Sequence, residues 1–250
     1  MTAHLLAGST PIPRFRGILF DKDGTLLDFE ATWAPLYRRL ALDLAGDDPE
    51  RAQSLLLAGG MDPATGRVVA GSILGAGTTH DIVGLWFPDL AEPEYSEMVR
   101  RIDTEFHAHG TGGSVPVPRL IATIQRLVED GYVLGVATND STHAARHALA
   151  GVGADTHLPH VYGYDSVPNP KPAPDIVHAF AAAAGLAPAE VVVVGDNRHD
   201  LEMARAAGAG AAIGVLTGNS GIADLSPLAD AVLKSIADLP DWLDRVRDLP

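Results

Sequence analysis

Two carboxylates stand close together where a short apolar run ends near the start of the sequence. Residues 18–20 are apolar and are followed by Asp21-Lys22-Asp23-Gly24-Thr25, so alternation along an extended backbone can point both acids the same way. Two anions this close repel each other, unless a divalent cation neutralises one or one of them is protonated. A solvated acidic turn is the plainer interpretation of this motif alone. A calcium-binding loop is a poor match, because Thr32 stands where such a loop requires Glu.

Polar residues that suit phosphoryl chemistry follow three further candidate strands. Thr138 supplies a neutral hydroxyl, Lys171 is one of only three lysines, and Asp196 and Asp200 supply two more carboxylates. If these loops meet at one edge of a sheet, they combine hard oxygen ligands for Mg²⁺ with one compact cation and one hydroxyl. Those are the minimum parts for binding and transferring a phosphoryl group.

Apolar runs alternate with helical patterns from residue 114 onward. Candidate strands cover residues 18–20, 132–137, 161–164, 191–194, 211–215 and 231–233. Helical periodicity and helix-start signals mark the segments between them, as where Pro174-Asp175 precedes a helical stripe. This alternation predicts an α/β fold with a Rossmann-like, doubly wound parallel sheet. Ligands of such sheets bind at the carboxyl ends of the strands, near the switch in strand order.

Residues 28–113 break this alternation. One helical stripe contains Trp33, Leu36, Tyr37, Leu40 and Leu44, another helix begins at Asp48-Pro49, and a glycine-containing middle precedes a last helix. The segment holds 6 arginines, no lysine and 14 carboxylates, which gives a net charge of −8. We therefore predict an inserted, mainly helical cap domain at residues 28–113 and a core domain formed by residues 1–27 and 114–250.

The composition excludes several classes of protein. Of the 250 residues, 46% are hydrophobic and 20% are charged, which is ordinary for a folded globular chain. The absence of cysteine excludes disulfides and thiolate chemistry, and the net charge of −14 is the wrong sign for general attraction to nucleic acid or anionic lipid. No segment approaches the roughly 20 apolar residues of a spanning helix. We therefore expect a cytoplasmic monomer or homodimer with no nucleic-acid or membrane partner.

The order, spacing and residue types of the four motifs resemble those of the haloacid dehalogenase superfamily of phosphohydrolases. The similarity is to the subgroup with a helical cap between the first two motifs, such as phosphoglycolate phosphatases. It implies that Asp21 is the nucleophile that forms an aspartyl-phosphate and that Asp23 is the acid/base. It also implies that Thr138, Asn139 and Lys171 bind the phosphoryl group.

The same resemblance implies a Mg²⁺ cofactor. The ion would be held by Asp196 together with the carboxylate of Asp21 and the main-chain carbonyl of Asp23. Asp200 would support the waters bound to the metal.

The resemblance also separates activities within the superfamily. Dehalogenating members lack an acid at the position of Asp23, and phosphonate-cleaving members need a cap lysine, whereas all three lysines here lie outside residues 28–113. We therefore expect a Mg²⁺-dependent phosphatase acting on a small phosphorylated metabolite, with phosphoglycolate as the first candidate. Two alternatives stay open. One is a sugar phosphomutase, although such members commonly have valine where this chain has Thr25, and the other is an inactive binding or regulatory homologue.

Several other chemically active side chains are interpreted as structural. His143 and His147 lie four residues apart on a predicted helix, and we interpret them as a surface pair because no Glu follows the first His. Trp33 is interpreted as core packing. Arg67 and His80 are positioned in the insertion, where they could meet the non-phosphate end of a substrate, but exposed or structural roles are favoured.

Overall fold

The computed structural model describes residues 15–110 and 113–247, and its centre is a six-stranded parallel sheet. The strands are β1 (Gly17–Asp21), β2 (Val133–Ala137), β3 (His160–Tyr162), β4 (Val191–Gly195), β5 (Ala211–Val215) and β6 (Ala231–Leu233). Their order is β3-β2-β1-β4-β5-β6, and every neighbouring pair is parallel. The order reverses beside β1, so the ligand-binding crevice of such a sheet lies at the carboxyl ends of β1 and β4. The predicted doubly wound α/β fold is confirmed.

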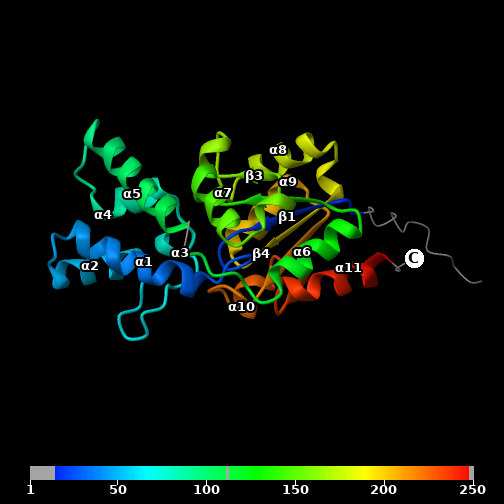
Figure 1. The fold of residues 1–250 in the computed structure, drawn as a ribbon, viewed down its shortest axis with the longest axis horizontal. Helices are drawn as coiled ribbons and strands as arrows, with labels where there is room; N and C mark the ends of the chain where they lie inside the picture. Colours follow the sequence, from blue (N-terminus) through cyan, green and yellow to red (C-terminus); the bar gives the residue numbers. More distant parts are fainter. Residues whose placement is uncertain (1–14, 111–112, 248–250) are drawn as a thin grey trace, which may run out of the picture.

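Helices cover both faces of the sheet (Figure 1). They are α6 (Leu120–Glu129), α7 (Thr142–Gly151), α8 (Asp175–Ala184), α9 (Arg198–Ala207), α10 (Ile222–Leu225) and α11 (Leu239–Arg247). Ile18 and Phe20 on β1 pack with α6 and α11 in one apolar cluster, whereas Leu19 between them packs with α8 and α9 in another. Strands β1, β4 and β5 are fully buried and almost entirely apolar, as expected where helices cover both faces of a sheet. Short 3₁₀ helices occupy Asp155–His157, Tyr164–Ser166, Pro188–Glu190 and Ile236–Asp238.

The segment between β1 and α6 is helical, as its sequence predicts. Its helices are α1 (Phe29–Leu44), α2 (Pro49–Gly59), α3 (Ile73–Ala76), α4 (Thr79–Trp86) and α5 (Glu94–Gly110). Asp28 caps α1 by accepting from the backbone N–H of Ala31, and Asp48 caps α2, which begins with Pro49. The apolar stripe of α1 is buried in a cluster whose members all lie between residues 29 and 106, in these helices and the loops that connect them. This separate cluster is what an independent cap requires, and the division into residues 28–113 and a surrounding core stays a prediction.

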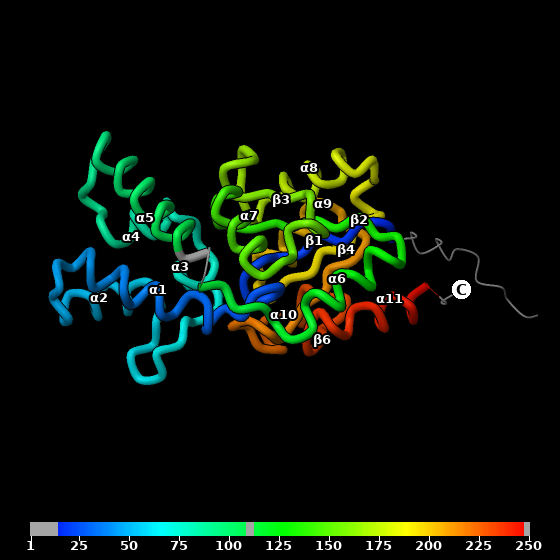
Figure 2. Tube along the Cα trace, in the orientation of Figure 1, coloured from blue at the N-terminus to red at the C-terminus, as the bar shows by residue number. Residues whose placement is uncertain are grey.

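The two connections between the helical segment and the sheet run side by side (Figure 2). Leu27 bridges to Pro116, the N–H of Asp28 donates to the carbonyl of Val115, and the N–H of Val117 donates to the carbonyl of Leu26. The predicted beginning of the core at residues 1–14 and part of the predicted exit from the insertion, residues 111–112, lie outside the described residues. Within the described ranges, no helix is both long and apolar enough to cross a membrane.

Phe180 on α8 covers the sheet where two adjacent strands carry glycine. A Cβ atom at Gly17 would lie 3.0 Å from Phe180 Cε1, and one at Gly135 would lie 2.7 Å from Phe180 Cε2. The side chain of Phe180 is fully buried. The two glycines therefore let the aromatic ring approach the backbone of β1, the strand that carries the first carboxylate motif.

We expect Phe180→Ala to lower the free energy of unfolding by about 3–5 kcal/mol, because it removes a buried ring and leaves a cavity over β1. Urea denaturation measures the change. His178→Ala, on the exposed side of the same helix, is the control and should change the free energy by less than about 0.5 kcal/mol. Equal effects of the two substitutions would contradict this account of α8.

Candidate active site

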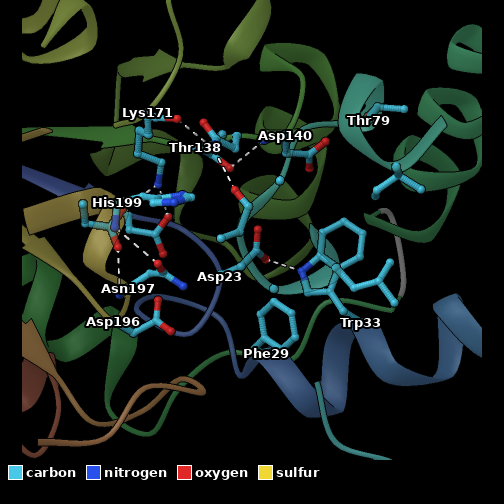
Figure 3. A pocket seen from close by; sticks show the side chains of 18 of the residues that line it. Asp23, Phe29, Trp33, Thr79, Thr138, Asp140, Lys171, Asp196, Asn197 and His199 are labelled. Atoms are coloured by element: carbon cyan, nitrogen blue, oxygen red, sulfur yellow. Dashed lines mark hydrogen bonds and ion pairs between the residues drawn. The ribbon is translucent and has the colours of Figure 1, made fainter. Parts of the chain in front are cut away.

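The loops at the carboxyl ends of the strands meet the helical segment around one cavity of about 70 Å³ (Figure 3). Every residue predicted from the sequence to form the site lines this cavity: Asp21, Asp23, Thr138, Asn139, Lys171, Asp196 and Asp200. Asp21 is the last residue of β1, Thr138 follows β2, and Asp196 follows β4. The topology places these positions together because the carboxyl ends of parallel strands share one edge of the sheet.

Lys171 connects two carboxylates inside the cavity. Its Nζ lies 2.6 Å from Asp21 Oδ1 and 2.7 Å from Asp200 Oδ1, and it also donates to the carbonyl of Ala137 at 3.1 Å. All three charged side chains are buried. Asp21 Oδ2 is also buried, and it has no hydrogen-bond partner among the described residues. The ammonium thus holds one oxygen of Asp21 and leaves the other available to a ligand.

Two glycines make room for the carboxylate of Asp196. Gly24 has φ of 86°, a conformation that strongly favours glycine, and a Cβ there would lie 2.5 Å from Asp196 Cγ. A Cβ at Gly218 would overlap the same carboxylate. The side chain of Asp196 accepts from the backbone N–H of Asn219 at 3.2 Å. The backbone therefore fixes this carboxylate from two sides.

The buried carboxylates form a group that suits a metal ion. Asp21, Asp196 and Asp200 each offer an oxygen, and these oxygens all lie within 4.8 Å of one another. Three carboxylates face one ammonium, so the cluster carries excess negative charge when all of them are ionised. Oxygen donors in this number and charge fit Mg²⁺, and the unpaired oxygen of Asp21 is a further donor.

The pKa values of the cluster record the same excess of negative charge. Burial raises the pKa of Asp21 to about 7 against the lowering effect of Lys171, and the neighbouring carboxylates of Asp200 and Asp23 raise it further. Burial, followed by repulsion from Asp21 and Asp200, raises the pKa of Asp196 well above its usual value. Burial alone would lower the pKa of Lys171, but Asp200 and Asp21 outweigh it and raise the pKa. A bound divalent cation would oppose the upward shifts of the carboxyls.

Thr138 and Asn139 form the wall contributed by the loop after β2. The hydroxyl of Thr138 is buried and accepts from the N–H of Asp140 at 3.1 Å. The side chain of Asn139 donates to the carbonyl of Lys171 at 3.3 Å and to that of Ala76, in α3, at 2.8 Å. Asn139 therefore contacts both the lysine loop and the helical segment.

Asp23 is contacted both by the core and by the helical segment. Lys22, which is fully buried, pairs with Asp23 Oδ2 at 2.8 Å and with Asp140 Oδ2 at 3.1 Å. Trp33 on α1 donates its indole N–H to Asp23 Oδ1 at 2.5 Å, and its ring lies 4.9 Å from the Lys22 ammonium (Figure 3). The predicted packing role of Trp33 is therefore incomplete, because this buried side chain also hydrogen-bonds a candidate catalytic carboxylate.

Sequence reasoning missed the residues that the helical segment and α9 add to the cavity. They are Phe29, Trp33, Tyr37, Leu74, Gly75, Ala76, Gly77, Thr79, Ile82 and Phe106, with Asp140, Asn197 and His199 from the core. Neither Arg67 nor His80 is among the described residues that line the cavity. Arg67 pairs with Glu30, with 3.7 Å between Nε and Oε1. The sequence signal that pointed to this part of the cavity was the apolar stripe that includes Trp33 and Tyr37, both of which line it.

Comparison with known sequences places the chain in a family. Residues 15–208 match the model of haloacid dehalogenase-like hydrolases. A phosphoglycolate phosphatase from Shigella boydii is 31% identical over 234 residues, which cover 90% of this chain and 90% of the relative.

Comparison with solved structures supports the same fold. The crystal structure of a predicted phosphoglycolate phosphatase from Haemophilus somnus has a TM-score of 0.70 at 24% identity and covers 91% of this chain and 97% of its own. CbbY from Rhodobacter sphaeroides, solved in complex with phosphate, has a TM-score of 0.66 at 23% identity and covers 90% of this chain and 96% of its own. The family model matches most of the chain, and a curated relative is similar over nearly its whole length. The chain therefore belongs to the haloacid dehalogenase-like hydrolase family.

Proposed function

We propose that the chain is a Mg²⁺-dependent phosphatase that hydrolyses a small organic phosphate monoester through an aspartyl-phosphate on Asp21. The observation that carries the proposal is the convergence of Asp21, Lys171 and Asp196 in one cavity, with one oxygen of Asp21 left without a partner among the described residues. The family and its phosphoglycolate phosphatase relatives support a phosphatase. Phosphoglycolate is the first substrate to test.

In the first step of the proposed reaction, Asp21 Oδ2 attacks phosphorus and the bond to the ester oxygen breaks. Lys171, which already fixes the other oxygen of Asp21, neutralises charge on the phosphoryl oxygens, and the Thr138 hydroxyl binds one of them. Asp23 in its protonated form gives its proton to the departing oxygen. Asp21, Asp23 and Asp196 would hold Mg²⁺, which when bound supplies positive charge to the phosphoryl group.

In the second step, the ionised Asp23 takes a proton from a water molecule that attacks phosphorus. The bond to Asp21 breaks, and inorganic phosphate and the free carboxylate result. Asp23 transfers a proton in both steps, so both depend on where its carboxyl group is held. It is held by Lys22 of the core and by Trp33 of the helical segment.

We further propose that residues 28–113 act as a cap that encloses the cavity. The contacts that join the helical segment to the core include those of Trp33 with Asp23, of Ala76 with Asn139, and of Asp103 Oδ2 with the Tyr164 hydroxyl, which donates to it at 2.6 Å. A cap that must open for substrate and close for reaction excludes bulk water from the aspartyl-phosphate.

Asp21→Asn tests the proposed nucleophile. It should lower phosphate release by on the order of 10⁴-fold or more, because the amide cannot form the covalent intermediate. The assay combines purified protein, Mg²⁺ and a panel of phosphate esters that includes phosphoglycolate. Acid-quenched wild type should carry a phosphoryl group, whereas the variant should not. Asp89→Asn, at an exposed aspartate, should behave as wild type.

The same assay separates the alternatives. A phosphomutase would release little phosphate and would depend on a sugar bisphosphate. An inactive homologue would give no difference between wild type and Asp21→Asn with any ester, and that result would remove the proposed function.

Removal of Mg²⁺ should lower stability in a pH-dependent way. A carboxyl whose pKa is higher in the folded protein than in the unfolded chain loses its contribution to stability as the pH rises. For Asp21 that loss runs from the ordinary pKa of 3.8 to about 7. Mg²⁺ should therefore raise the free energy of unfolding most above this range.

Asp196→Asn isolates the metal contribution. In Mg²⁺-free buffer at about pH 8, this variant should be more stable than wild type, because repulsion among the buried carboxylates is reduced. It should also lose the stabilisation by Mg²⁺ that wild type shows. Urea denaturation with and without Mg²⁺ measures both effects, and Asp89→Asn is again the control. An unchanged response of Asp196→Asn to Mg²⁺ would be evidence against the metal assignment.

Trp33→Phe tests the contact between the cap and Asp23. Loss of a hydrogen bond to a charged group should lower kcat by about 10-fold to 100-fold, while the phenyl ring retains much of the packing. Trp86→Phe is a matched control, since Trp86 is also a buried tryptophan of the helical segment but donates to the carbonyl of Leu55 at 2.9 Å. If both variants lower kcat equally, the effect comes from packing in the cap and not from Asp23.

A further inference from the structure

Three histidines from two distant parts of the chain meet between the helical segment and the core. His107 is on α5, and His143 and His147 are one turn apart on α7. Helices α5 and α7 pack against each other, and Figure 1 shows α5 ending beside α7. The ring centroid of His107 lies 4.0 Å from that of His143 and 3.8 Å from that of His147. Because α7 follows the loop that carries Thr138 and Asn139, the three residues sit next to the cavity wall without lining it.

The geometry of the three side chains is close to that of a nitrogen-ligand metal site. Each histidine offers a ring nitrogen, and these nitrogens all lie within 4.8 Å of one another. Tetrahedral Zn²⁺ with Zn–N bonds of about 2.0–2.1 Å needs nitrogens roughly 3.3 Å apart with converging lone pairs. The rings of His107 and His143 are stacked with an interplanar angle of 10°, so they must turn about their side-chain bonds to complete the set. His143 and His147 are four residues apart on one helix face, which is the spacing at which two side chains of a helix meet a common ligand.

The surroundings give an ion both access and attraction. His143 is exposed and His107 and His147 are partly exposed, so the cluster lies near the surface, although Nδ1 of His107 is itself buried. The helical segment that carries His107 has a net charge of −8 over residues 28–113, which attracts cations.

We propose that His107, His143 and His147 bind one divalent transition-metal ion of the Zn²⁺ class, with solvent in the remaining coordination position. The site differs in chemistry from the carboxylate cluster, because imidazole nitrogens select Zn²⁺, Ni²⁺, Co²⁺ or Cu²⁺ whereas carboxylate oxygens suit Mg²⁺. It is also independent of the proposed phosphatase reaction.

The bound ion joins the cap to the core. One ligand comes from α5 of the helical segment and two come from α7, so binding favours the arrangement in which these helices are in contact over any in which they separate. The same arrangement places Trp33 against Asp23 and Ala76 against Asn139. A transition-metal ion at the three histidines therefore stabilises the enclosed form of the cavity.

Metal titration of untagged, chelator-treated protein tests the site. Saturating Mg²⁺ is present so that the carboxylate cluster is filled, and Co²⁺ is added as a probe whose visible spectrum reports nitrogen ligands. We expect one Co²⁺ per chain, displaced by Zn²⁺. His107→Ala and His147→Ala should each weaken binding by about tenfold or more, because each removes a ligand. The exposed His178→Ala should bind as wild type does.

Two further variants separate this site from the alternatives. Asp196→Asn should retain the Co²⁺ spectrum, because it changes only the carboxylate cluster. His107→Phe keeps a ring between the helices but supplies no nitrogen, so it should remain folded while losing the rise in thermal midpoint that Zn²⁺ gives wild type. Equal Co²⁺ binding by wild type and His107→Phe, or loss of the spectrum in Asp196→Asn alone, would overturn the proposal and leave the three rings as a packing contact.

Discussion

The excess negative charge buried at the carboxyl edge of the sheet is the constraint on which the site depends. Asp21, Asp196 and Asp200 share one ammonium, that of Lys171, and the sheet and its glycines hold all four groups out of water. Such a cluster is unfavourable unless further positive charge arrives, and this is why burial and repulsion raise the pKa of Asp21 and Asp196. The fold thus keeps its carboxylates in an arrangement that favours a divalent cation and a phosphoryl group, and the rigid parallel sheet supplies the stability that this arrangement lacks.

A second buried ion pair performs a different task. Lys22 lies between Asp23 and Asp140, and Trp33 meets Asp23 from the helical segment. Asp23 is therefore positioned partly by the core and partly by α1. In the proposed reaction, the group that moves protons reaches its full set of contacts only when the helical segment lies against the sheet. In the proposed reaction, the hydrogen bond from Trp33 to Asp23 thus links the proton-transfer group to the enclosure of the cavity.

The sequence predicted the strand-end residues well because their positions follow from topology alone. Once residues 18–20 and 191–194 are recognised as parallel strands, Asp21 and Asp196 must share an edge whatever the rest of the chain does. The contacts made by Trp33 and His107 depend instead on how inserted helices pack against the core, and periodicity gives only the buried face of each helix. The interpretation of His143 and His147 as a surface pair used only the missing Glu after the first His, and the register of α5 that brings His107 beside them has no local signal in the sequence.

The wall that the helical segment presents to the cavity limits what the site can accept. Phe29, Leu74 and Phe106 are apolar, and no lysine or arginine occurs on this wall among the described residues. This wall and the strand-end groups together line the cavity of about 70 Å³. An anionic end meets no cationic side chain on the described part of this wall. The N–H groups of Gly75 and Gly77 already donate to the carbonyls of Ser72 and Ile73, and the hydroxyl of Thr79 donates to Asp103 Oδ1. The charged groups that line the cavity thus come from the sheet edge, whereas the helical segment contributes apolar and uncharged polar groups.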